Sequence, residues 1–313
     1  MRAIVWPGMP DGLGLERAAA AIGRPLEIEV ISSNEDLELL MDDGRPCDLI
    51  FPSDYLVEKL VAEGRLRDIS GDRRIDRDLL AEWCRHPAYD PDERFAIPFA
   101  FGLTGLLHDG SVSPSSWSDF FDPEGGVKVG LLDEVREVLG AALILAGRSP
   151  NRMDGESLAE AARILRRQRP AVASRSSDDF TGPVERGEVS MHLAWSGPAS
   201  MAIHRSPGLR FTVPREGALL WVTTASVPAG APDPDASVEL IAALMEPGIA
   251  ALAVENGGYS SPNTAARDLL RDELREDPVL FPPVEQIRRC QTTTSLSAAE
   301  ERAMLDLWEL ETT

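Results

Sequence analysis

Alternating apolar and polar positions near the amino terminus predict the first β-strands. Leu26, Ile28 and Val30 are separated by glutamates, a period of two that is typical of a strand with one buried face. Residues 48–51, with the sequence DLIF, lack this alternation and predict a strand that is buried on both faces. The chain therefore begins with strands that belong to a packed sheet.

Helical patterns alternate with these strands. One helix is expected over residues 36–43, after the cap candidates Ser33 and Asn34, and another begins at Ser53 and ends at Gly64. The order strand, helix, strand, helix predicts a parallel sheet with right-handed crossovers. The predicted fold class is α/β.

Three more helices are expected later in the chain. The first carries Leu158 and Leu165 on one face, the second runs over residues 234–246, and the third follows a capping box formed by Ser297 and Glu300. No repeat or long linker separates these patterns into two successive domains.

The charge balance excludes whole classes of partner. The 313 residues include 52 acidic and 31 basic side chains, a formal net charge of -21, and their cations are scattered. Nucleic acids and anionic membranes require clustered Lys and Arg, so no nucleic acid partner is predicted, whereas a cationic small ligand is compatible. With 43% hydrophobic residues the chain can fill its cores.

The sequence lacks the common local motifs of catalysis, metal binding and export. The sequence contains no phosphate-binding glycine motif, no nucleophile elbow and no zinc signature, and its three cysteines have no paired spacing. We therefore expect no cofactor, no metal and no enzymatic activity. The first residues lack the charged and apolar segments of a signal peptide, so the chain carries no export signal of its own by this prediction.

Aromatic and acidic residues are the most informative candidates for a binding site. Glu134 and Glu137 are three residues apart at the start of a predicted helix, and aromatic rings attract cations. Together they predict an amine-binding cleft, although the same carboxylates could simply complement a helix dipole and the rings could pack in a core. The aromatic candidates are expected at strand ends, where α/β proteins bind ligands: Trp6, Tyr55, Trp195, Trp221 and Tyr259.

Several segments, in the same order along the chain, resemble the spermidine/putrescine-binding family, the solute receptors of polyamine ABC importers. The resemblance extends from Trp6 to the final helix and therefore covers nearly the whole chain. The matching segments are DLIFPSDYLVEKLVAEGRLRDIS (48–70), AIPFAFGLTGLLHD (96–109), SWSDFFDPE (116–124), DEVREV (133–138), GEVSMHLAWSGPA (187–199), PREGALLWVTTASVP (214–228) and GGYSSPNTAARDLL (257–270).

This resemblance implies a type II periplasmic-binding-protein fold, with two α/β lobes joined by crossing hinge strands. Lobe 1 would comprise residues 1–103 plus 222–267, lobe 2 residues 104–221 plus 268–313, and the ligand cleft would lie between them. The implied function is an extracytoplasmic, periplasmic receptor that is a monomer, binds a polyamine (putrescine or spermidine) or a related small amine, and works with the permease and ATPase subunits of an ABC importer.

The resemblance also implies the ligand contacts. Aromatic residues would flank the methylene chain, and Glu134 and Glu137 would bind ammonium groups. Neutral polar contacts would come from other positions of the same motifs. The full set is Trp6, Ser53, Tyr55, Glu134, Glu137, Trp195, Trp221, Thr223, Tyr259 and Gln291.

Two departures from the family pattern bear on the ligand. Thr223 stands where the family has an aspartate, and Pro7, Gly8 and Met9 replace polar residues and a tyrosine. One lost charge-assisted hydrogen bond predicts roughly ten- to hundredfold weaker polyamine binding, so a shorter or monocationic amine would fit better. Neutral or zwitterionic amino compounds stay open as ligands. An intracellular sensor of the same fold, binding an amino-acid-like solute, is the alternative function.

Overall fold

The computed structural model describes residues 1–10 and 12–312, which form two compact units. Unit 1 contains the segments 1–101 and 221–277, and unit 2 contains the described residues from 102 to 220 and from 278 onward. The units therefore break after residues 101, 220 and 277, whereas the resemblance implies lobes that break after 103, 221 and 267. Two long strands, β4 (Ala96–His108) and β9 (Leu219–Ser226), contain the first two of these breaks.

The strands of unit 1 lie in the order β2-β1-β3-β9. The parallel start predicted from the sequence is confirmed, because β1 pairs in parallel with both β2 and β3. The sheet is nevertheless mixed, since β9 returns antiparallel to β3 from much later in the chain. The first three strands are β1 (Arg2–Val5), β2 (Glu27–Val30) and β3 (Leu49–Ile50).

The predicted burial of β2 is wrong at its end. Val30 is 61% exposed, while Ile28 is only partly buried. The reason is position in the sheet: β2 is the edge strand and pairs with β1 alone, so no second strand encloses its last residue. By contrast, β3 is fully buried as its continuous apolar sequence predicts.

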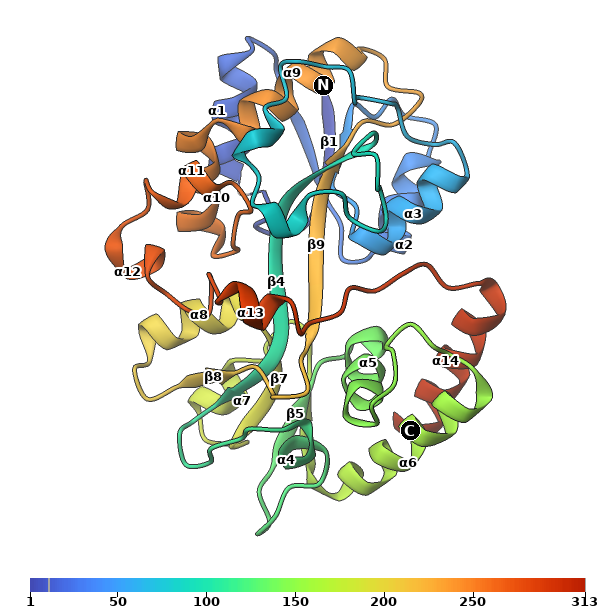
Figure 1. Cartoon of the computed structure of the whole chain (residues 1–313), viewed down its shortest axis with the longest axis vertical. Helices are drawn as coiled ribbons and strands as arrows, with labels where there is room; N and C mark the ends of the chain where they lie inside the picture. The colour runs from blue at the N-terminus through green and yellow to red at the C-terminus, as the bar shows by residue number, and fades with distance from the viewer. Residues whose placement is uncertain (11, 313) are drawn as a thin grey trace. The chain divides into compact units, whose positions relative to one another are not determined.

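Helices lie on both sides of the unit 1 strands, with α1, α9 and α10 on one side and α2 and α3 on the other (Figure 1). As predicted, Ser33 caps α2, accepting the Asp36 backbone N–H. Among the described residues, no single helix has the length and apolar composition of a membrane span; only α9 and α10 taken together do, and they are bent by 72°. The helices are α1 (Gly12–Ala21), α2 (Asn34–Met41), α3 (Asp54–Ala62), α9 (Pro234–Met245), α10 (Pro247–Gly257), α11 (Thr264–Arg267) and α12 (Asp272–Arg275), with 3-10 turns at Arg77–Leu79 and Glu82–Cys84.

In unit 2 the strand order is β4-β7-β5-β6, and β8 pairs with β4. The second half of β4 runs antiparallel to β7 and β8, while β5 is parallel to both β6 and β7. The remaining strands are β5 (Val129–Leu131), β6 (Val172–Arg175), β7 (Met191–Trp195) and β8 (Arg210–Thr212).

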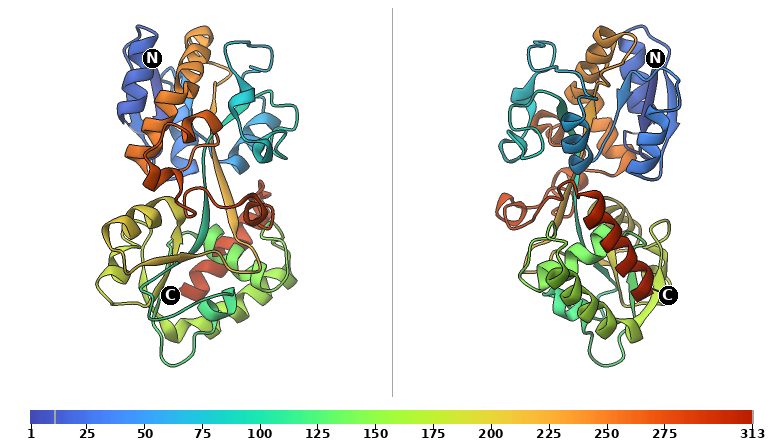
Figure 2. Two further views of the ribbon diagram at one scale, coloured as in Figure 1. Left: turned by 60° about the vertical axis from the view of Figure 1, so that its left-hand side comes forward. Right: turned by 90° about the vertical axis from the view of Figure 1, so that its right-hand side faces the viewer.

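Three helices of unit 2 pack together, with α14 beside α5 and α6 (Figure 2). The core beneath them includes the fully buried rings of Trp117, Phe120 and Phe121. The capping box predicted at the last helix is confirmed, because Ser297 Oγ and Glu300 Oε2 each bond the other residue's backbone N–H. The helices are α4 (Trp117–Phe121), α5 (Val135–Leu145), α6 (Gly155–Gln168), α7 (Gly182–Glu185), α8 (Ser196–Arg205), α13 (Val284–Ile287) and α14 (Ala298–Thr312), with a 3-10 turn at Arg169–Ala171.

Candidate functional site

The first candidate in unit 1, Trp6, directly follows β1. Its indole Nε1 donates a hydrogen bond of 2.7 Å to the backbone oxygen of Phe51, which fixes the ring against the end of β3. The chain then reverses, because the backbones of Trp6 and Met9 bond each other and Gly8 has a φ of +69°. That left-handed conformation favours glycine, so the turn itself explains one of the residues that depart from the family pattern.

Ser53 and Tyr55 lie at the start of α3 and share one hydrogen-bonding partner. The amide Nδ2 of Asn34 donates to Ser53 Oγ at 3.0 Å and to Tyr55 Oη at 2.7 Å. The Ser53 backbone N–H in turn donates to Asn34 Oδ1, which sets the orientation of the amide. Asn34 is only 5% exposed and was identified in the sequence solely as a cap candidate. Its role in holding two site candidates is a finding of the structure.

Trp221 and Thr223 occupy alternate positions of β9 and so belong to the same face of that strand. A backbone bridge pairs Thr223 with Ser53, and the ring of Tyr259 meets that of Trp221 edge-on at 5.8 Å. The Nε1 of Trp221 is buried and has no hydrogen-bonding partner. Burial also raises the pKa of Tyr259. These neutral side chains therefore form one continuous group with Ser53.

The expected placement at strand ends is wrong for three of the aromatic candidates. Tyr55 is the second residue of α3. Trp221 is the third residue of β9, inside the strand, and Tyr259 follows α10 rather than a strand. The turn after α10 is made by Gly258, which has a φ of +73° and brings Tyr259 back toward β9.

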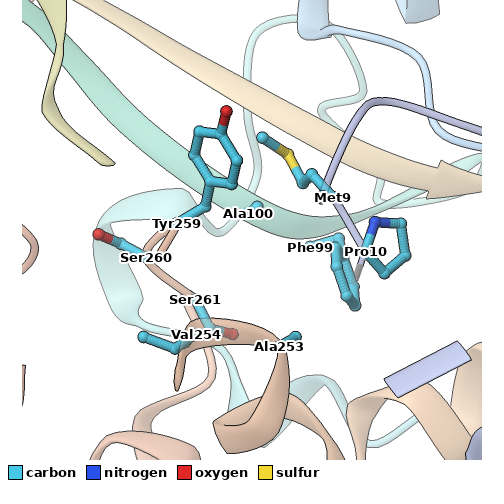
Figure 3. A pocket seen from close by; sticks show the side chains of 10 residues that line it. Met9, Pro10, Phe99, Ala100, Ala253, Val254, Tyr259, Ser260 and Ser261 are labelled. Carbon is cyan, nitrogen blue, oxygen red and sulfur yellow. The ribbon is translucent and has the colours of Figure 1, made fainter. Parts of the chain in front are cut away.

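A small cavity beside Tyr259 contains no charged group. Figure 3 shows Tyr259 and Met9 facing each other across it, with Phe99 and Pro10 below, and Ala253 and Val254 from α10 completing its apolar wall. Its volume of about 10 Å³ is room for about one water molecule. The cavity is therefore a packing feature of unit 1 and too small to hold a ligand.

In unit 2 the two glutamates lie at the start of α5. Glu134 is the N-cap residue and has an extended backbone, while Glu137 lies in the first helical turn. The Glu137 side chain is partly exposed as a whole, but its Oε2 is buried and has no hydrogen-bonding partner. Burial raises the pKa of Glu137, whereas the nearby Thr104 hydroxyl, Trp195 indole and Arg136 guanidinium act in the opposite direction.

Trp195 and Gln291 complete the candidates in unit 2. Trp195 ends β7, where it pairs with Thr104 of β4, and its ring meets Phe180 edge-on at 5.4 Å. Gln291 follows α13 and joins the start of β9 through backbone hydrogen bonds with Ala218 and Leu220. Thr104 lies within the matching segment 96–109 but was missed in the sequence, because only the pairing of β4 with β7 brings it next to Trp195.

The candidates divide between the two units, with contacts that join Ser53 to Tyr55 and Thr223, Trp221 to Tyr259, and Glu137 to Trp195. We call Trp6, Ser53, Tyr55, Trp221, Thr223 and Tyr259 the neutral group of unit 1, and Glu134, Glu137, Trp195 and Gln291 the acidic group of unit 2. Within residues 1–10 and 12–312, no cluster of three His, Cys, Asp or Glu side chains could hold a metal ion.

The known family of bacterial extracellular solute-binding proteins matches residues 26–282 of this chain. The chain belongs to this family. Among its relatives, the spermidine/putrescine-binding periplasmic protein of Escherichia coli K12 is 31% identical over 303 residues, which cover 93% of this chain and 85% of that protein. The putrescine-binding periplasmic protein PotF of the same organism is 26% identical and covers 82% and 76%, respectively. The resemblance found in the sequence is therefore confirmed.

Solved structures agree with this assignment. This solute-binding protein is similar to the spermidine/putrescine ABC transporter substrate-binding protein PotD of Streptococcus pneumoniae, with a TM-score of 0.89, 25% identity and coverage of 100% and 98%. A putative spermidine/putrescine ABC transporter protein from Listeria monocytogenes has a TM-score of 0.90 at 22% identity and supports the fold alone. The predicted type II periplasmic-binding-protein fold is confirmed.

Proposed function

We propose that this solute-binding protein is the extracytoplasmic receptor of an ABC importer for a polyamine or related small amine. Its relatives are spermidine/putrescine-binding periplasmic proteins, and its sequence matches theirs over nearly its full length. In this proposal the two units are the ligand-binding lobes, and the neutral group and the acidic group contact the same ligand from the two lobes.

The observation that carries the proposal is the Glu137 carboxylate. Leaving a buried carboxylate oxygen without a partner costs free energy, and an ammonium group supplies the missing hydrogen bond together with an opposite charge. Trp195 lies beside this carboxylate and can add a cation–π contact of about 0.5–2 kcal/mol. A carboxylate next to an aromatic ring is the arrangement that an alkylammonium ligand requires.

In the proposed function, the protein binds and releases its ligand without a chemical step. A ligand that contacts both units favours the conformation in which both units can bind it. The size of this effect is the difference between the ligand's affinity for that conformation and its affinity for the conformation without such contacts. We propose that the bound form is then recognised by the permease, that the ATPase drives transport, and that the receptor acts as a monomer.

A titration of the full chain tests this function. Trp6, Trp195 and Trp221 belong to the two groups, so tryptophan fluorescence should change on binding, and calorimetry should confirm the affinity. The compounds are putrescine, cadaverine, spermidine, agmatine and 4-aminobutyrate. Saturable micromolar binding of at least one of them is expected, whereas no binding of any compound at millimolar concentration would overturn the proposed function.

A further inference from the structure

The two groups offer opposite chemistry to a ligand. The acidic group contains carboxylate oxygens, which accept hydrogen bonds from an ammonium. The neutral group contains no carboxylate, and its unsatisfied atom is the Nε1 of Trp221, which can only donate. An ammonium cannot bond to this atom, because both groups are donors.

A second donor in unit 1 follows from the position of Asn34. Its amide N–H occupies one of the two acceptor positions on Ser53 Oγ, so the hydroxyl keeps its proton to donate and one lone pair to accept. Ser53 begins α3 without using its side chain as a helix cap, which keeps the hydroxyl directed at other partners. The bridge from Ser53 to Thr223 places this hydroxyl next to the β9 face that carries Trp221.

Thr223 removes the possibility of an anion on that face. It is 4% exposed, uncharged, and two residues beyond Trp221. The nearest carboxylate in sequence, Asp54, is 1% exposed; its Oδ1 accepts the Tyr55 backbone N–H, and burial followed by the nearby Asp54 charge raises the pKa of the Tyr89 phenol. Asp54 therefore serves the start of α3 and the core around Tyr89.

We propose that the ligand is a monoamine whose opposite end is an oxygen acceptor, such as an amino alcohol or an ω-amino carboxylate. The ammonium binds to Glu137 in unit 2, and the oxygen accepts hydrogen bonds from Trp221 and Ser53 in unit 1. This inference rests on the proposed function, since it assumes that both units contact one ligand.

A matched series of four-carbon ligands tests the inference by calorimetry on the full chain. Putrescine, 4-amino-1-butanol and 4-aminobutyrate share the chain and one ammonium and differ only at the other end. At least one oxygen-ended compound should bind about tenfold tighter than putrescine, because one added hydrogen bond to a buried donor increases affinity by about that factor. Comparing the alcohol with the carboxylate then distinguishes a neutral from an anionic acceptor.

The possible outcomes separate the two proposals. If putrescine or another diamine or polyamine is the tightest ligand, the oxygen-ended inference is wrong and the receptor function holds. If neither the four-carbon series nor the wider set of compounds contains an amine that binds, the proposed receptor function is wrong. The oxygen-ended inference is then wrong as well.

Substitutions at Thr223 sharpen this test. Thr223→Asp should raise putrescine affinity about tenfold and weaken the oxygen-ended ligand by a similar factor, while the matched neutral control Thr223→Asn should not raise putrescine affinity. An increase that is equal in both variants would contradict the inference. Thermal unfolding first checks that each variant folds. If Thr223→Asp does not fold, Trp221→Phe decides, because it should weaken the oxygen-ended ligand severalfold more than it weakens putrescine.

Discussion

The neutral group of unit 1 and the acidic group of unit 2 differ in which of their polar atoms have no hydrogen-bonding partner. In the neutral group three side chains are bonded within unit 1: Trp6 donates to Phe51, and Asn34 donates to Ser53 and Tyr55. In unit 2 a carboxylate oxygen of Glu137 is buried without a partner. In the function proposed above, the acidic group supplies the strong attraction for a cation, and the neutral group selects among cations by the chemical group at the other end of the ligand.

The largest expected effect is on the acidic side of this comparison. Glu137→Gln removes the charge of the carboxylate whose Oε2 has no partner, so affinity for a cationic ligand should fall roughly ten- to hundredfold, about 1.5–3 kcal/mol. Glu35→Gln is the matched control, because Glu35 is an exposed carboxylate in the first turn of α2 and should not affect binding. Equal affinities of the wild type and Glu137→Gln in calorimetry would remove Glu137 from the binding site.

The next effect concerns the amide that holds the neutral group. Asn34→Ala removes hydrogen bonds to Ser53 and Tyr55 and should lower the free energy of unfolding by about 1–3 kcal/mol, measured with denaturant. It should also weaken ligand binding severalfold, since the Ser53 hydroxyl can then turn toward α3.

Asn263 provides the control for that substitution. It is similarly buried, donates to the Met245 carbonyl and caps α11 by accepting the Ala266 N–H. Asn263→Ala should cost a similar free energy of unfolding without a comparable change in affinity. If both variants lose affinity equally, Asn34 acts only through stability.

A smaller effect separates two tryptophans of the same group. Trp6→Phe removes the hydrogen bond to the Phe51 carbonyl and should cost about 1 kcal/mol of unfolding free energy. Trp221→Phe removes a donor that has no partner, so its unfolding free energy should stay within about 0.5 kcal/mol of the wild type. A larger loss for Trp221→Phe than for Trp6→Phe, in denaturant titrations, would show that the indole nitrogen of Trp221 is bonded within unit 1.

The smallest expected effect is a pH dependence. Burial raises the pKa of Glu137 above its ordinary value of 4.5, so the folded protein holds this proton more tightly than the unfolded chain. The stabilisation from the protonated form is present below 4.5 and is lost as the pH rises through the raised pKa. Ligand affinity should increase over the same range, because an ammonium binds to the ionised carboxylate.

The comparison with Glu137→Gln isolates this titration from those of the other carboxylates. The difference in unfolding free energy between the two proteins should change as the pH rises above 4.5 and level off once the pH exceeds the raised pKa of Glu137. A difference that is constant over this range would mean that the Glu137 pKa is not raised.

Much of the architecture follows from residues that are near one another in sequence. The continuous apolar segment around Leu49 predicts the buried strand β3, and Ser33 and Ser297 predict helix starts that the structure confirms. These features depend on periodicity and caps within a few residues. The motifs that connect the chain to the solute-binding family are also local, which is why the fold could be predicted nearly in full.

Tertiary structure decided what the candidate side chains can do. Asn34 meets Ser53 and Tyr55 across 19 and 21 residues, and Thr104 pairs with Trp195 from a distant strand. The exposure of Val30 likewise depends on β2 being the edge strand, which its own sequence does not reveal. Which atoms are bonded or left without a partner depends on segments that meet only when the chain folds. The sequence therefore determined the fold and the candidate residues, and tertiary structure decided that Glu137 Oε2 of the acidic group and Trp221 Nε1 of the neutral group are buried without a hydrogen-bonding partner.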